Sequence, residues 1–235
     1  MVIGDFFSEK NGSISFTRQQ GSDFAKQVAD DFNPLHDADA KRFCIPGDLL
    51  FAIILSKYGL SRHMEFTFSG MVMAGTELVL PDIGPQLLFQ DVDGKLFLRA
   101  DRSGENTRNQ ALIRNLTDSY VRFSGHTFPD ILVPLLARQK VMINPQRPMV
   151  IYESMQIDLD TLDITEPVLQ VENNELKLDG KRGNVLLSFN LVEGDAVVGR
   201  GRKRMVLGGL RDYDEATMNQ ALEVFDERKR ALGRG

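Results

Sequence analysis

Residues 30–37 read Asp-Asp-Phe-Asn-Pro-Leu-His-Asp and are the most informative stretch of the chain. Proline and the residue before it disfavour helical geometry, so Asn33-Pro34 predicts a turn rather than a helix. Such a turn can bring the side chains of Asp31 and His36 toward one point. A carboxylate and an imidazole that meet there could hold a water molecule and move its protons.

The same residues also have a purely structural explanation. Asp and Asn next to proline often start turns in which their short side chains bond backbone groups two residues further on. A short motif is a weak indicator of chemistry, so on the residues alone the structural explanation is the more common one. Both interpretations stay open at this level.

The turn resembles the signature of the MaoC-like, or hydratase 2, branch of the hotdog superfamily, which runs Gly-Asp-any-Asn-Pro-aliphatic-His. The residues that match this signature in type and spacing are Asp31, Asn33, Pro34, Leu35 and His36. The resemblance implies reversible hydration of a trans-2-enoyl thioester, in which Asp31 and His36 activate one water. It also implies that Asn33 helps to orient this water.

The motif differs from the signature at two places, and these differences leave functions other than a hydratase open. Asp30 replaces the glycine of the signature, so a second negative charge lies beside the site, where it could alter the acidity of the site or point to solvent. The family usually has a His-Gly pair at the start of its central helix, where this chain has Pro46-Gly47. Two alternatives therefore accompany the hydratase. One is a non-catalytic hotdog module that binds an acyl thioester or a protein, and the other is an acyl-CoA thioesterase.

A strongly apolar segment follows the turn. Residues 49–55 read Leu-Leu-Phe-Ala-Ile-Ile-Leu, which predicts a helix enclosed by other structure on every side. Asp48 lies just before this run and complements the helix dipole. The resemblance implies that Pro46, Gly47 and Asp48 contact the substrate and that a backbone N–H at Gly47 polarises the thioester oxygen. A plain glycine at the start of a helix explains Gly47 equally well.

Strand-like segments fill most of the remaining chain. In the first half they cover residues 64–72, 77–80, 86–92 and 95–100, with Asp93-Gly94 as a hairpin turn. In the second half they cover residues 149–159, 167–171, 176–178, 185–192 and 196–207, with turns at Asn173-Asn174 and Gly194-Asp195. Residues 13–17 also form a strand-like segment. Residues 22–29 have helical periodicity, with Ser22 as a possible N-cap.

The second half contains a weak copy of the motif. Residues 120–129 can be laid over the first motif with His126 over Asp31. In this register Ile131 falls where His36 stands, so the copy lacks an acid–base pair. We therefore expect His126 to be structural and each chain to have one working site.

The order of elements predicts the fold class. An apolar helical run at residues 131–137 mirrors the run at residues 49–55, and strands follow each run. We therefore predict an α+β tandem double hotdog fold, with two buried central helices on one continuous antiparallel sheet. Residues 1–115 form the first unit, which carries the motif, and residues 116–235 form a degenerate second unit.

Length, charge and cysteine content restrict the function. A chain of 235 residues is long enough to bury a full core. A net charge of −5 argues against nucleic acid as a partner, because phosphate binding needs a basic surface. The single cysteine, Cys44, cannot form an internal disulfide, so a reducing compartment is expected, with Cys44 as a buried filler.

Several partners are not expected from the sequence. The first ten residues lack the apolar core of a signal peptide, and residues 49–55 are far too few to span a bilayer. The three histidines and the cysteine lack the spacing of metal ligands. We expect a cytoplasmic protein without a cofactor, whose substrate carries coenzyme A or acyl carrier protein. The chain could act as a monomer of two units or as a homodimer.

A basic cluster lies near the C-terminus and contains Arg200, Arg202, Lys203 and Arg204. These residues could contact coenzyme phosphates. Strand alternation would instead place the three arginines on one exposed face as ordinary surface residues, which is the more common arrangement. From Phe16 to Asp214 the chain also resembles a bacterial family of about this length whose function is not established.

Overall fold

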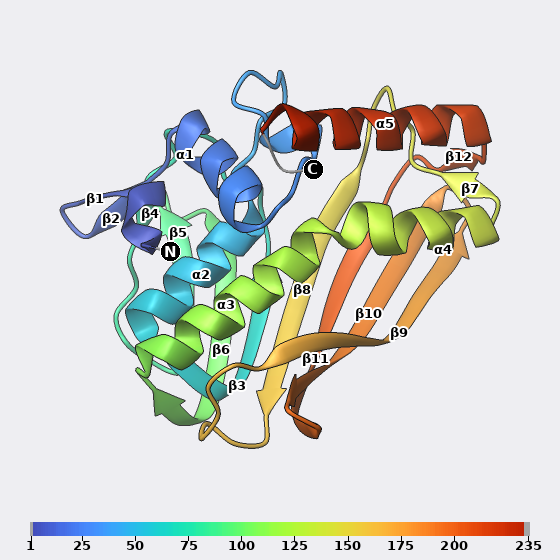
Figure 1. The fold of residues 1–235 in the computed structure, drawn as a ribbon. Coiled ribbons are helices and arrows are strands. Elements are labelled where there is room, and N and C mark those ends of the chain that lie inside the picture. The colour runs from blue at the N-terminus through green and yellow to red at the C-terminus, as the bar shows by residue number, and fades with distance from the viewer. Residues whose placement is uncertain (1, 233–235) are drawn as a thin grey trace.

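One antiparallel sheet forms the frame of the molecule (Figure 1). The structure is a computed structural model that describes residues 2–232. The strands of this sheet are Ser8–Lys10 (β1), Ser13–Ser15 (β2), Leu60–Phe68 (β3), Leu78–Val79 (β4), Gln86–Asp91 (β5), Leu96–Thr107 (β6), Val150–Leu159 (β8), Val168–Asp179 (β9), Arg182–Glu193 (β10) and Ala196–Leu207 (β11). Their order across the sheet is β1-β2-β4-β5-β6-β3-β8-β11-β10-β9. Val141–Met142 (β7) and Arg211–Asp212 (β12) form a second, small sheet.

The two halves of the chain share this sheet, and they meet where β3 pairs with β8. The pairing runs from His63 opposite Asp158 to Thr67 opposite Ser154. Along β3 the buried residues Met64 and Phe66 alternate with exposed ones, because successive side chains of a strand point to opposite faces.

Helices cover one face of the sheet (Figure 1). They are Ile3–Phe6 (η1), Arg18–Asp23 (α1), Phe24–Val28 (η2), Pro34–His36 (η3), Gly47–Tyr58 (α2), Gln110–Gly125 (α3), Phe128–Leu132 (η4), Val133–Arg138 (α4) and Glu215–Ala231 (α5). The predicted α+β tandem hotdog architecture is confirmed, because one continuous antiparallel sheet carries helices from both halves of the chain.

Helix α2 is the buried helix that the apolar run predicted. All residues from Asp48 to Leu55 are buried, and so is Tyr58. The aromatic ring of Phe51 packs edge-on against Phe66 of β3, with ring centroids 5.2 Å apart. Gly59 ends the helix with a φ of 82°, a conformation that glycine adopts without strain.

The second helix differs from the prediction, because α3, η4 and α4 follow one another as a nearly continuous rod. Residues 120–125 lie inside α3 and do not form a turn. Asn109 caps the start of α3, and buried residues recur at helical spacing along it. Pro129 is accommodated because the rod widens into the π-helical segment η4, which relieves the clash that proline causes in an α-helix. The predicted unit boundary at residues 115/116 falls within α3.

The first helix also begins earlier than predicted. Thr17 caps α1 and forms a capping box with Gln20, so the helix starts at Arg18 and Ser22 is not its N-cap. The Thr17 side chain accepts a hydrogen bond from the Gln20 N–H, and the Gln20 side chain accepts one from the Thr17 N–H. The chain then continues into the π-helical segment η2, which leads to the motif.

The turn predicted at Asn173-Asn174 is wrong. Both residues lie inside the long strand β9, which pairs with β10 without interruption by a loop. Asn173 faces Ser188, and Val171 faces Phe189, so Glu172 is an extra residue that forms a β-bulge. The bulge explains why the sequence pattern indicated two strands with a turn between them, because a bulge disturbs the alternation of side chains without ending the strand. By contrast, the turns at Asp93-Gly94 and Gly194-Asp195 are confirmed.

The C-terminal helix α5 was not predicted. Asp214 caps it by accepting a hydrogen bond from the Thr217 N–H at 2.8 Å. Met218 and Phe225 are buried, and Leu222 packs beside Met218 in the core cluster of the second half. These three residues recur at helical spacing, which was an available signal for an amphipathic helix.

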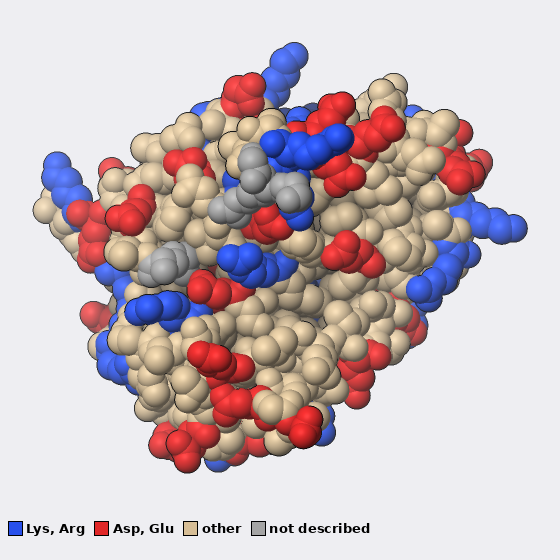
Figure 2. All heavy atoms as spheres, in the orientation of Figure 1, with Lys and Arg blue, Asp and Glu red and all other residues tan. Residues whose placement is uncertain are grey.

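The surface carries mixed charge. On the face shown in Figure 2, acidic and basic side chains are interspersed and form no large area of one sign. Within residues 2–232, no helix is both long and apolar enough to cross a membrane.

Candidate active site

The motif of residues 30–37 folds into a tight turn. This turn has features of both explanations given above, the structural turn and the acid–base pair. Asp31 Oδ1 accepts a hydrogen bond from the Asn33 N–H at 2.8 Å, and Asn33 Oδ1 accepts one from the Leu35 N–H at 3.0 Å. The structural role of Asp and Asn before proline is therefore present. Asn33 Oδ1 caps η3, so the side-chain amide nitrogen and the second lone pair of Oδ1 are left for the implied role of orienting a water. The second oxygen of Asp31 remains free of this turn.

The structure brings the predicted acid–base pair together. His36 Nε2 lies 3.7 Å from Asp31 Oδ2, and the side chains are only 13% and 19% exposed. His36 Nδ1 lies 2.9 Å from the carbonyl oxygen of Cys44, and a carbonyl can only accept, so Nδ1 carries a proton. The Nε2 atom thus faces Asp31. This separation is too long for a direct hydrogen bond, so both atoms stay available to a water molecule beside them.

Charge and burial determine the protonation of His36. Burial lowers the pKa of His36, but the contact with Cys44 and the negative charge of Asp31 outweigh it and raise the pKa to about 9. At neutral pH the pair is therefore an imidazolium facing a carboxylate. Such a pair contains both a proton donor and a proton acceptor at one place.

Cys44 does more than fill the core. It is partly exposed rather than buried, which corrects the prediction of a buried filler. Its backbone oxygen orients His36, and its Sγ atom lies 4.0 Å from His36 Nδ1. The segment that carries Cys44 is held in place by the hydrogen bond from its N–H to the carbonyl oxygen of Leu35 at 3.2 Å.

Asp30 neither points to solvent nor joins the acid–base pair. It is buried, and its Oδ2 lies 2.7 Å from His126 Nε2 and 3.2 Å from Lys229 Nζ. Its φ of 53° is left-handed, which glycine adopts readily and aspartate tolerates, so the exchange of the signature glycine for Asp30 is sterically explained. Burial raises the pKa of Asp30, but hydrogen bonds and charges from His126 and Lys229 outweigh it, so the pKa is lowered.

The predicted substrate-contacting residues lie at the start of α2. Pro46 is buried, and Gly47 is half-buried. A Cβ on Gly47 would lie 3.0 Å from the ring of Phe68 and 3.3 Å from the ring of Tyr152. The space that the missing side chain leaves is therefore occupied by an aromatic pair, which supports the packing explanation of this glycine. Its N–H still lies in the first turn of α2, where no carbonyl of the helix can accept it.

Asp48 joins a buried polar cluster that the sequence did not reveal. Its Oδ2 accepts a hydrogen bond from Ser124 Oγ at 2.5 Å, whereas its Oδ1 is buried without a hydrogen-bond partner among the described residues. Burial raises the pKa of Asp48, and the charge of Lys203 only partly opposes this effect. The charges of Asp31 and His36 also affect the pKa of Asp48, so the acid–base pair lies within electrostatic range of the cluster.

Lys203 is the main residue that sequence reasoning missed. Its ammonium donates to Ser124 Oγ at 2.5 Å and lies 4.5 Å from the ring centroid of Tyr152, and the residue is only 4% exposed. Burial lowers its pKa, although Asp48 and Asp31 act in the opposite direction. The arginines at 200, 202 and 204 are exposed, as strand alternation predicted. The same alternation places Lys203 on the inner face, and that signal was available.

Two tyrosines close the cluster. The hydroxyl groups of Tyr120 and Tyr152 form a hydrogen bond with each other. Burial raises the pKa of both phenols well above its usual range, so both remain neutral. The cluster thus combines residues from α2, α3, β8 and β11, whereas the acid–base pair comes from the motif turn alone.

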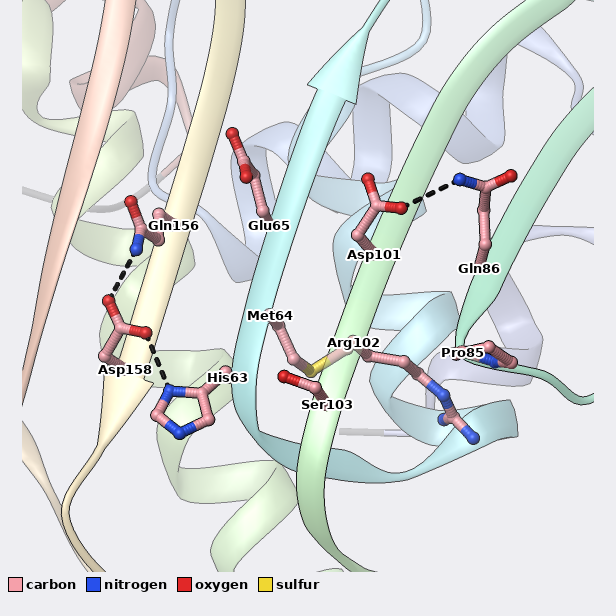
Figure 3. A pocket seen from close by; sticks show the side chains of 10 residues that line it. All are labelled: His63, Met64, Glu65, Pro85, Gln86, Asp101, Arg102, Ser103, Gln156 and Asp158. Carbon is pink, nitrogen blue, oxygen red and sulfur yellow. Dashed lines mark hydrogen bonds and ion pairs between the residues drawn. The ribbon is translucent and has the colours of Figure 1, made fainter.

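A hollow on the opposite face of the sheet is separate from this site (Figure 3). Its volume is about 440 Å³, and it is lined by residues of β3, β5, β6 and β8 together with Pro85, which precedes β5. His63 Nδ1 lies 2.9 Å from Asp158 Oδ1 there, and Gln156 donates to the other oxygen of Asp158 at 2.7 Å (Figure 3). The first contact joins β3 to β8, and the second runs along β8. Within residues 2–232 no group of three or more His, Cys, Asp or Glu side chains is placed to hold a metal ion.

The family model described as "Protein of unknown function (DUF3581)" matches residues 1–216. The chain belongs to this family. In this DUF3581 chain the matched region contains the motif turn, α2, Ser124 and Lys203, whereas all but the first two residues of α5 lie beyond it. The search of curated proteins found no match to the chain.

Solved structures similar to the DUF3581 chain are distant from it. An acyl-CoA thioesterase II from Mycobacterium marinum is 8% identical with a TM-score of 0.43, and the match covers 91% of this chain and 99% of that one. A tesB protein from Mycobacterium avium subs paratuberculosis is 8% identical with a TM-score of 0.41, covering 70% and 87%. The peroxisomal multifunctional enzyme type 2 from Drosophila melanogaster is 12% identical with a TM-score of 0.43, covering 82% and 47%. At this distance the likeness assigns no activity.

Proposed function

We propose that the chain catalyses the reversible addition of water to a trans-2-enoyl thioester carried by coenzyme A or acyl carrier protein. The observation that carries this proposal is the pairing of Asp31 with His36 across 3.7 Å, with His36 held by the carbonyl oxygen of Cys44. A water molecule between the two side chains would contact a proton acceptor on one side and a proton donor on the other.

The protonation of the pair fits this reaction. Asp31 takes a proton from water, and the oxygen forms a bond to the β-carbon of the enoyl group. The electrons of the double bond move toward the thioester carbonyl, and the imidazolium of His36 gives its proton to the α-carbon. A proton then passes from Asp31 back to His36. Because the pKa of His36 is about 9, the imidazolium form that this step needs is present at neutral pH.

The start of α2 would serve the thioester carbonyl. Gly47 and Asp48 stand in its first turn, where backbone N–H groups and the helix dipole favour developing negative charge. Helix α2 has twelve residues, so its dipole is fully developed. Pro46, Gly47 and Asp48 remain the proposed substrate-contacting residues.

The direct test follows crotonyl-coenzyme A with the purified protein, recording enoyl absorbance and free thiol together. We expect enoyl absorbance to fall by more than any release of free thiol accounts for, because hydration leaves the thioester bond intact. Asp31→Asn and His36→Ala should each lower this rate by about a hundredfold to ten-thousandfold, which is the usual contribution of general acid–base catalysis. His63→Ala is the matched control, because His63 also pairs with an aspartate but lies on the outer face.

The alternatives predict different results in the same assay. A fall in enoyl absorbance that thiol release fully accounts for, and that does not depend on His36, would identify a thioesterase instead. If neither signal changes with longer acyl chains, while acyl thioesters raise the melting temperature, a non-catalytic binding module is correct. A cytoplasmic location and assembly as a monomer of two units or a homodimer remain predictions.

A further inference from the structure

Ser124 stands between a buried anion and a buried cation. Its Oγ donates to Asp48 Oδ2 at 2.5 Å and accepts from Lys203 Nζ at 2.5 Å. Asp48 and Lys203 are 8% and 4% exposed, whereas Ser124 is half-buried and therefore lies nearer to the surface than its two partners. A nucleophile flanked by a base and by a group that fixes its orientation has this geometry.

A purely structural ion pair does not account for the cluster. Among the described residues, Asp48 and Lys203 form no direct ion pair within 4.0 Å, and their link runs through the serine hydroxyl. Asp48 Oδ1 is buried without a partner, and such a group is costly unless it serves another purpose. An ammonium has three donors, and its contacts here are one hydroxyl and the ring of Tyr152.

The position of Ser124 places it beside the proposed substrate. The next residue, Gly125, packs against the motif turn so closely that a Cβ there would overlap the carbonyl oxygen of Ala29 and lie 3.2 Å from Asp31 Cβ. Through Asp48, Ser124 also lies next to the first turn of α2, where the N–H groups of Gly47 and Asp48 have no acceptor within the helix. Nucleophile, base and a site for an oxyanion therefore come together beside Asp31.

We propose that Ser124 is a nucleophile that accepts the acyl group of a thioester, with Asp48 as its base and Lys203 as the cation that stabilises its oxygen. The substrate class rests on the proposed function, but the reaction is a second one, acyl transfer followed by hydrolysis. It needs no carbon–carbon double bond in the acyl chain.

Each step balances. Asp48 takes the proton of Ser124, and Oγ bonds to the carbonyl carbon, whose oxygen becomes an anion near the N–H groups of α2. The carbon–sulfur bond then breaks, and the leaving sulfur takes the proton from Asp48 to give a free thiol and an acyl ester on Ser124. Water attacks this ester, Asp48 takes the proton of the water, and the same proton returns to Ser124 as the carboxylic acid leaves. The raised pKa of Asp48, which burial causes, makes its carboxylate a stronger base.

The experiment uses saturated acyl-coenzyme A, such as hexanoyl-coenzyme A, because a saturated chain cannot be hydrated. Free thiol is measured, and the intact protein is weighed by mass spectrometry after rapid quenching. We expect thiol release and a hexanoyl adduct on Ser124. Ser124→Ala should lose both, with a decrease in rate of at least about a hundredfold. Ser124→Cys should still form the adduct, because a thiol of similar size replaces the hydroxyl.

Matched controls separate the proposal from a structural role. Ser119 lies on the same helix and accepts only from the Leu169 N–H, so Ser119→Ala should leave thiol release unchanged. Lys203→Met should slow adduct formation at least tenfold, whereas Arg202→Met on the exposed face of the same strand should not. If Ser124→Ala fails to fold, the Ser124→Cys variant and the mapped site of the adduct still decide the question.

Two results would overturn the proposal. One is the absence of both thiol release and adduct in the wild type across chain lengths. The other is thiol release by Ser124→Ala at the wild-type rate. Neither result bears on hydration, which is measured separately with crotonyl-coenzyme A and depends on His36. Conversely, a protein that forms the adduct but does not hydrate crotonyl-coenzyme A would support Ser124 and contradict the proposed function.

Discussion

Asp30 and Asp31 are neighbours in the chain, yet each faces a different histidine at a different distance. Asp30 lies 2.7 Å from His126, within hydrogen-bond distance, and also contacts Lys229 of α5. Asp31 lies 3.7 Å from His36, beyond that distance. The left-handed backbone at Asp30 turns the chain sharply, so successive carboxylates can reach different partners.

The two separations indicate two roles for the same pair of residue types. A buried carboxylate bonded directly to a histidine and a lysine holds elements together, here the motif turn, α3 and α5. A carboxylate and an imidazole that form no direct hydrogen bond both stay available to a water molecule or a substrate atom beside them. A histidine near an aspartate is therefore informative only together with the distance and the other contacts of each group.

The largest effect is expected at the glycine that packs against the start of the motif turn. Gly125 precedes His126 in the chain, and a Cβ there would overlap the backbone oxygen of Ala29 and lie 3.2 Å from Asp31 Cβ. Because backbone atoms cannot move aside as a side chain can, Gly125→Ala should lower the free energy of unfolding by about 4 kcal/mol or prevent folding. Gly4→Ala is the control, since a Cβ at Gly4 meets nothing within 4 Å. Denaturant unfolding measures both, and equal stability of the two variants would contradict this packing.

The Asp31–His36 pair should make the free energy of unfolding depend on pH in the alkaline range. The pKa of His36 is raised from 6.5 to about 9 in the folded protein, so its contribution is fully present below pH 6.5 and is lost as pH rises through about 9. Its full size is on the order of 3 kcal/mol at about 1.4 kcal/mol per pKa unit. The wild type should lose this amount relative to His36→Gln between pH 6 and pH 10. If the free energies of unfolding of the two proteins change in parallel with pH, the folded structure does not raise the pKa of His36.

Asp30→Asn should mainly affect stability. The substitution weakens the contacts to His126 and Lys229 and should lower the free energy of unfolding by about 1–3 kcal/mol, because it leaves buried partners poorly satisfied. The lowered pKa of Asp30 means that its contribution is present above its ordinary pKa and is lost as pH falls through the lowered value. Thermal unfolding at pH 7 and pH 3 checks this, and Asp30→Asn should approach the wild type at the lower pH. A strong loss of hydration activity in Asp30→Asn protein that is still fully folded would assign Asp30 to catalysis. Asp30 and Asp31 would then no longer have different roles.

The smallest effect is expected at Lys229, which contacts Asp30 of the Asp30–His126 pair. Lys229 is partly exposed and contributes one contact to Asp30, so Lys229→Met should cost at most about 1 kcal/mol of unfolding free energy. The loss should shrink in high salt, because exposed ion pairs are screened. Arg228→Met, which removes the contact to Asp37 instead, is a comparison on the same helix. A loss above about 2 kcal/mol for Lys229→Met would mean that α5 depends on this pair.

The sequence predicted the elements whose signals are local. The apolar run of α2, the hairpin turns and the alternation in β11 are each contained in a few neighbouring residues. The Asp31–His36 pair belongs to the same group, because a turn of six residues joins its two members. Neighbouring residues were therefore sufficient to predict the acid–base pair, which is one of the two parts of the candidate site.

The remaining half depends on contacts between distant residues. Ser124 meets Asp48 across 76 positions and Lys203 across 79, and neither spacing leaves a pattern in the chain. The overlay of residues 120–129 on the first motif also failed, because the helical spacing of α3 prevailed over the resemblance of a few residues. Only Lys203 left a usable signal, since it is the inward-facing basic residue of β11.

The pairing of β3 with β8 has a consequence for fragments of the chain. A fragment that ended before β8 would leave without partners those backbone N–H and C=O groups of β3, between His63 and Thr67, that face β8. Met64 and Phe66, now buried, lie along that strand. An open strand edge beside apolar side chains is a template for pairing with other molecules. Each half of the sheet thus protects the other from aggregation, and separately expressed halves should form insoluble assemblies unless both are present during folding.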